Sequence, residues 1–212
     1  NAAFIPSYTE ANLNSTIEGK KFADDVLNLL IIVLLGIVLI VEIFTPATVY
    51  LIAPGFYEDF EKFDLAVELT RITFPFLFFV SLSSFFSGIL NTNNKFAAAA
   101  AAPIILNIIL ILSLLISYFF DLNFELNLSY AVTLAGLIQL LFLIVFTKKY
   151  YKPSVDFKIK INLKVKFFLK KLLPSIFSSG VTQINILIGT IIASFEAGAV
   201  SYLYYADRIY QI

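Results

Sequence analysis

Two arginines are the residues of this sequence whose type and position best suit chemistry inside a membrane. The chain contains thirteen Lys and two Arg; every Lys lies in a predicted loop or tail, and both Arg lie within predicted spans. A charge at the centre of a membrane helix costs about 2.5 to 3.5 kcal/mol on insertion scales, so a retained one usually faces a cavity or a partner. Arg208 is about ten residues into its helix, beside Asp207. Because adjacent helical residues point about 100° apart, we favour a cavity-facing Arg208 over neutralisation by Asp207.

The second arginine, Arg71, has two readings. It lies about six residues from the outer end of its span, close enough to reach the interface, and Glu68 precedes it by three positions. Structural pairing with Glu68 is favoured, and a place in a substrate site is the alternative. For Glu42, near the outer end of another span, we expect a water-exposed position.

An apolar segment from about Leu172 to Phe195 carries a polar face. Ser179, Gln183 and Ser194 lie on it at offsets of 0, 4 and 15, with Asn185 alongside. Small and hydroxyl residues commonly pack membrane helices together, but two carboxamides within three residues would also suit a polar cavity. Both readings stay open, and Asn107, one turn after Pro103, either caps the carbonyl freed by that proline or faces the same cavity.

Several function classes are excluded by composition. The chain has no Cys and no His, which removes thiolate nucleophiles, imidazole bases and almost every zinc or haem site. Only one aspartate, Asp207, lies within a span, and no glycine-rich phosphate loop occurs. We therefore predict a protein that is not an enzyme, with no catalytic residues, no metal and no cofactor. A formal net charge of zero argues against nucleic acid as a partner.

The elements that would position these residues are transmembrane helices. Hydrophobic residues make up 59% of the 212 and charged residues 14%, against about 45 to 50% and about 25% in soluble domains. A bilayer core of about 30 Å needs about 20 apolar residues. Five complete spans are predicted, with a sixth beginning near Ala199, and residues 1–25 read as the end of one helix and an interfacial segment. The five spans cover about 26–52, 65–90, 97–120, 129–146 and 172–195.

Lysine distribution predicts the orientation of the spans. Residues 148–171 hold nine Lys and one Asp, a balance of 9 − 1 = +8, so they should be a cytoplasmic linker. Alternation then places residues 54–64 and 121–128 outside, and both of these loops are acidic. We expect an all-α polytopic bundle in which residues 1–147 form part of one lobe and residues 172–212 begin a second.

Seven short motifs, in order and with matching spacing, resemble those of the MurJ (formerly MviN) family of bacterial lipid II flippases. They are Ala3–Pro6, Ala53–Phe56, Thr70–Phe76, Ser87–Asn91, Ala102–Asn107, Gln183–Asn185 and Tyr204–Arg208. The resemblance covers essentially the whole chain and implies two helical lobes around a central cavity. Because the chain has no Met and stops within an apolar segment, we expect an internal fragment holding about six transmembrane helices, the third to the eighth of the family.

The resemblance also implies the function. The family moves the undecaprenyl-diphosphate-linked peptidoglycan precursor from the inner to the outer leaflet of the bacterial cytoplasmic membrane, and Arg208 matches its functional arginine in the eighth helix. Lipid II and membrane lipids are then the expected partners, with cell-wall synthesis proteins as a further class. A related exporter of drugs or of other lipid-linked polysaccharides, or a non-transporting scaffold of the same fold, is the alternative. The substrate-binding residues that we predict are Arg208, Asp207, Gln183, Asn185, Asn107 and Arg71.

Overall fold

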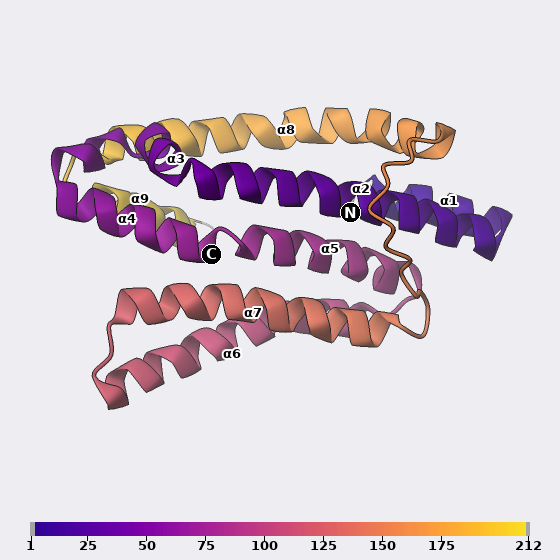
Figure 1. Cartoon of the computed structure of the whole chain (residues 1–212), viewed down its shortest axis with the longest axis horizontal. Helices are drawn as coiled ribbons and strands as arrows, with labels where there is room; N and C mark the ends of the chain where they lie inside the picture. The colour runs from indigo at the N-terminus through magenta and orange to yellow at the C-terminus, as the bar shows by residue number, and fades with distance from the viewer. Residues whose placement is uncertain (1–2, 211–212) are drawn as a thin grey trace.

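The computed structural model describes residues 3–210, and within that range the chain is helical, without β-strands (Figure 1). The elements are α1 (Phe4–Asn14), α2 (Thr16–Ile43), α3 (Thr45–Ile52), the 3-10 helix η1 (Pro54–Glu58), α4 (Phe60–Thr73), α5 (Phe76–Thr92), α6 (Phe96–Phe120), α7 (Phe124–Thr147), α8 (Leu163–Ala193) and α9 (Ala199–Tyr210). Five segments are long and apolar enough to cross a membrane: α2, α4 with α5, α6, α7 and α8. The predicted all-α polytopic class is confirmed.

Helices α2 and α8 begin several residues before the apolar spans expected from the sequence. The Ser15 side chain caps α2 by accepting a hydrogen bond from the Ile17 N–H at 3.1 Å, so the helix starts at Thr16 and not near Val26. Likewise α8 starts at Leu163, inside the segment expected to be a linker, because the Asn162 side chain accepts from the Val165 N–H at 2.9 Å. Polar residues that lie at the end of a span can continue its helix beyond the hydrocarbon.

Prolines divide two of the predicted spans. Pro46 cannot donate to the Glu42 carbonyl, and the Thr45 hydroxyl donates to that carbonyl instead at 2.9 Å, where α2 ends and α3 begins. Around Pro75 the chain breaks between α4 and α5, and the Ile72 carbonyl accepts from the Thr133 hydroxyl of α7 at 2.6 Å. At each break a threonine hydroxyl therefore donates to a backbone carbonyl, which lowers the cost of the break in a membrane.

Helices α5, α6 and α7 pack together on one side of the molecule, with α7 between α5 and α6 along much of its length (Figure 1). Gly136 of α7 permits the close approach to α5, since a Cβ there would lie 2.6 Å from the Phe76 ring. Near the end of α6 and the start of α7 the Asn127 side chain donates to Ser117 at 2.8 Å, which joins α7 to α6. The main core lies toward the opposite end, around Phe22, Ile89 and other buried apolar side chains.

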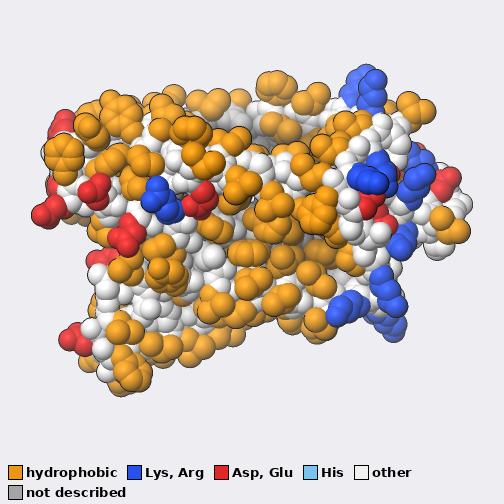
Figure 2. Space-filling view, viewed as in Figure 1, with side chains coloured by type: hydrophobic (Ala, Val, Ile, Leu, Met, Phe, Trp, Pro, Cys, Tyr) orange, Lys and Arg blue, Asp and Glu red, His pale blue; other side chains and the backbone are white. Residues whose placement is uncertain are grey.

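Charges gather at the two ends of the molecule and apolar side chains cover the middle. Figure 2 shows Lys side chains mainly at the end formed by the linker and acidic side chains mainly at the end near α3 and α4. Aromatic rings cluster near the acidic end, where Tyr57 contacts Tyr50 and Phe63 with centroids 5.5 and 5.3 Å away. An apolar belt with a flanking aromatic layer is the surface of a protein that lies in a bilayer.

Candidate functional site

Helix α8 carries the predicted polar face and is largely uncovered by the rest of the described chain. Every residue from Leu173 to Ile188 is exposed except Gly180, and this range includes Gln183 and Asn185. The helix touches α1 and α2 near its beginning and α3 and η1 near its end. In Figure 1 it runs along the edge of the bundle above α2. The polar face is thus presented on a helix that is held at both ends.

The C-terminal end of α8 is joined to η1 by a buried hydrogen bond. Ser194 is 2% exposed, and its Oγ accepts from the Gly55 N–H at 3.0 Å. A Cβ on Gly55 would lie 2.4 Å from the Ser194 carbonyl carbon and oxygen, so only glycine fits this approach. Of the predicted polar face, Ser194 therefore acts as a packing contact, which was one of the two readings of that face.

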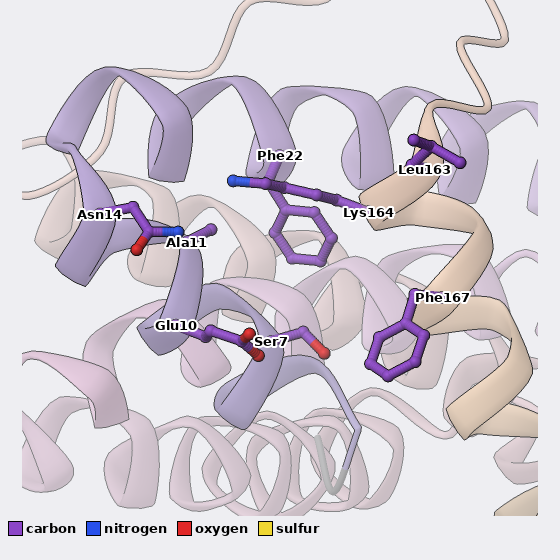
Figure 3. A pocket seen from close by; sticks show the side chains of 8 residues that line it. All are labelled: Ser7, Glu10, Ala11, Asn14, Phe22, Leu163, Lys164 and Phe167. Atoms are coloured by element: carbon purple, nitrogen blue, oxygen red, sulfur yellow. The ribbon is translucent and has the colours of Figure 1, made fainter.

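The other end of α8 packs into the main core. Val165 and Phe168 are buried, and the Phe168 ring lies edge-on to Phe22 and Phe4, with centroids 5.9 and 6.4 Å away. A hollow of about 210 Å³ adjoins this contact, and Figure 3 shows the side chains that line it, among them Phe167. Burying these apolar rings fixes the start of α8 to the first two helices.

Polar residues of α2 bind the extended linker, residues 148–162. We call Asp24, Asp25 and Asn28 the docking cluster. Asn28 donates to the Ser154 carbonyl at 3.0 Å, and its Oδ1 accepts from the Asp156 and Phe157 N–H groups at 3.0 and 3.2 Å.

The two aspartates of the docking cluster complete this attachment. Asp24 accepts from the Tyr151 hydroxyl at 2.6 Å and from the Ser154 N–H at 3.0 Å, while Asp25 accepts from Asn162 at 2.7 Å. Burial and the bond to Asp24 raise the pKa of the Tyr151 hydroxyl, so it stays protonated and keeps donating. The docking cluster holds the linker through six hydrogen bonds.

Sequence reasoning missed the docking cluster. Its signal was present: three polar residues at positions i, i+1 and i+4 where an apolar helix begins, a spacing that places them on neighbouring faces. Nothing in that pattern names the linker as the partner, because the bonded residues are more than 120 positions away in the chain.

Arg208 and Asp207 lie on α9, which folds back along α8. Gly198, at φ +77°, makes the turn, and a Cβ on Gly189 of α8 would lie 3.4 Å from the Leu203 side chain of α9. Asn185 precedes the first of these contact residues by four positions and Asp207 follows the second by four. At 1.5 Å per residue, Asn185 and Asp207 each lie about 6 Å along their own helix from the Gly189–Leu203 contact. Because the two helices run in opposite directions, both residues lie on the same side of that contact and at a similar level.

The guanidinium of Arg208 lies over an aromatic ring. Its Cζ is 4.9 Å from the centroid of Tyr204, one turn earlier on α9, a cation–π contact that orients the guanidinium. The planar fork of a guanidinium matches the geometry of carboxylate and phosphate oxygens.

The other two predicted site residues, Asn107 and Arg71, lie on α6 and α4. Asn107 is an exposed residue of α6, which packs on α7 and α5 and not on α8, and Figure 1 draws α6 and α8 on opposite sides of the bundle. Arg71 is exposed on α4. Glu42 is half-buried on α2, and its Oε1 is buried without a hydrogen-bond partner among the described residues; the water-exposed position expected for it stays a prediction.

A sequence model of the family described as Lipid II flippase MurJ matches residues 1–212, the whole chain. The chain belongs to the MurJ family. It is 41% identical to a probable lipid II flippase MurJ of Rickettsia prowazekii over 99% of the chain and 41% of the relative. It is 32% identical to the lipid II flippase MurJ of Burkholderia cenocepacia, over 98% of the chain and 41% of that protein.

A solved structure shows the same fold. The lipid II flippase MurJ in an inward closed conformation superposes with a TM-score of 0.77 at 31% identity, covering 99% of the chain and 43% of that structure. The chain thus spans about two fifths of the length of the MurJ proteins that it matches. Members of the MurJ family are multi-pass inner-membrane transporters and not enzymes, which agrees with the apolar belt described above.

Proposed function

We propose that this chain takes part in moving lipid II from the inner to the outer leaflet of the cytoplasmic membrane by alternating access. Membership of the MurJ family carries this proposal. The polar hairpin of α8 and α9 supports it, because a diphosphate and sugar head group must be shielded from about 30 Å of hydrocarbon. Cell-wall synthesis proteins remain an expected partner class.

Within that function we assign the diphosphate contact to Arg208. Its guanidinium, which lies over the Tyr204 ring in the last turn of α9, supports this assignment, because a planar fork of N–H donors suits phosphate oxygens. Gln183, Asn185 and Asp207 on the same hairpin would contact the sugar and peptide groups through hydrogen bonds. Asn107 and Arg71 stay in the proposed site only if other helices bring them to the same cavity.

The test replaces Arg208 in the complete gene product, expressed in a host depleted of its own lipid II flippase. Arg208→Ala should abolish growth support and leave lipid II in the inner leaflet while protein abundance is unchanged. Arg208→Lys should restore growth only in part, since an ammonium keeps the charge but loses the bidentate fork.

A structural role for Arg208 as the counter-ion of Asp207 predicts a different pattern. Arg208→Ala would then lower protein abundance, because a carboxylate would be left in the membrane without its partner. The double change Asp207→Asn with Arg208→Gln would restore both abundance and flipping. Recovery of flipping in that charge-free variant would remove Arg208 from the substrate site.

The topology that goes with this function is part of the proposal. The linker and the Lys-rich end of the molecule face the cytoplasm, and η1 and the loop between α6 and α7 face outward. The separation of charge between the two ends of the molecule supports this orientation (Figure 2).

A further inference from the structure

A hollow of about 810 Å³ at the Lys-rich end is lined by cationic side chains from distant parts of the chain. Lys20 of α2 lines it, together with Lys148, Lys149 and Lys152 at the end of α7 and the start of the linker. No acidic side chain is among its described lining residues. The hollow is therefore a concentrated positive site of a size that fits a head group.

The lysines of this hollow have no ion pair among the described residues. The ion pairs at this end are those of Lys160 with Asp156 and of Lys164 with Glu18, and neither involves a lysine of the hollow. The nearby carboxylate of Asp24 is occupied by hydrogen bonds from Tyr151 and Ser154. The positive charge of the hollow is thus not compensated by ion pairing within the described chain.

An apolar hollow of about 430 Å³ adjoins the first one. Lys149 and Tyr150 line both, and the second is otherwise formed mainly by apolar side chains such as Leu90, Phe96 and Phe146, with Lys95 at its edge. It lies where α6 begins and α7 ends, at the level where a span meets the membrane interface. A cationic hollow that continues into an apolar one matches a molecule with a phosphate and an acyl chain.

We propose that the two hollows form one binding site for an anionic glycerophospholipid of the inner leaflet. The phosphate lies among Lys148, Lys149 and Lys152, and an acyl chain runs past Phe96 and Phe146 between α6 and α7. Basic pockets between membrane helices on the cytoplasmic side bind anionic head groups by this combination of charge and apolar contact. The site rests on the proposed topology but is separate from Arg208 and the α8–α9 hairpin.

The experiment measures lipid binding to the purified full chain in phosphatidylcholine nanodiscs titrated with phosphatidylglycerol. Replacing Lys148, Lys149 and Lys152 together with Gln should weaken phosphatidylglycerol binding at least about tenfold, since each surface lysine contributes about fivefold. The matched control replaces Lys158, Lys170 and Lys171 with Gln, which removes the same charge from the same end of the molecule but none from the two hollows. The control should lose clearly less binding than the site variant, because its lysines do not line the two hollows.

Equal losses in the two triple variants would overturn the site, because general attraction to a basic end would then explain binding. No loss in either would overturn it as well. If the triple variant fails to insert, Lys149→Gln alone should lose about fivefold, because this residue lines both hollows. Soluble glycerol phosphate, added in competition, distinguishes a lipid ligand from a free phosphate compound. At millimolar concentration it should not displace phosphatidylglycerol, and displacement would contradict the lipid assignment.

Discussion

At the scale of single residues, the contact between Gly55 and Ser194 leaves no space for a larger side chain at position 55. The two residues belong to η1 and the end of α8, and the glycine lies against the serine backbone with no room for a methyl group. The contact holds the C-terminal end of α8, the helix with the polar face, to η1.

Gly55→Ala is therefore expected to destabilise the protein by about 1 to 3 kcal/mol through overpacking, seen as a lower midpoint of thermal unfolding in detergent. Gly36→Ala is the matched control, because nothing lies within 4 Å of a Cβ there. In the interior of α2 the control should leave stability unchanged or raise it by up to about 1 kcal/mol. Equal midpoints for the two variants would show that the close approach at Gly55 carries no energetic weight.

Prediction from sequence was most accurate where apolar residues run on without interruption. The span expected at about 97–120 is α6, Phe96–Phe120, because Lys95 and Asp121 flank an apolar run that contains no charge. The start of α2 was placed about ten residues too late, since Glu18, Lys20 and Asp24 look like a soluble segment although they extend the same helix. Pairings such as Gly55 with Ser194, 139 positions apart, leave no trace in periodicity, so sequence alone could not find them.

At the scale of elements, the attachment of the linker to α2 makes it an ordered part of the structure. Although its backbone is extended, it has buried hydrogen-bond partners along residues 151–162. Asn28 is the central member, being 3% exposed and bonded to three linker residues. The start of α8 is thereby fixed relative to α2 by polar bonds as well as by the core.

Asn28→Ala should release the linker, because it removes both the donor to Ser154 and the acceptor for Asp156 and Phe157. The expected cost is about 1 to 3 kcal/mol, measured as faster chymotrypsin cleavage after Phe157. Lys160→Ala is the control: it breaks only an exposed ion pair, worth about 0 to 1 kcal/mol, and should leave cleavage nearly unchanged. Unchanged cleavage in Asn28→Ala would contradict the attachment.

At the scale of the whole molecule, orientation follows from where the charges lie. Single cysteines at Ser154 in the linker and at Phe124 at the start of α7 test it, because the chain has no Cys and both positions are exposed. An impermeant thiol reagent added outside intact cells should label position 124 and spare position 154. Labelling in the reverse pattern would overturn the proposed topology, and with it the inner-leaflet lipid site.

The separation of charge across the molecule also has an electrical consequence. The chain has no net charge, yet with its Lys-rich end inside and its acidic end outside it is a dipole aligned with the membrane potential of a bacterium, which is negative inside. Carrying one positive charge outward against 100 mV costs about 2.3 kcal/mol. Each lysine of the linker therefore adds to the free energy that opposes inversion, so an energised membrane reinforces the orientation set when the chain was inserted.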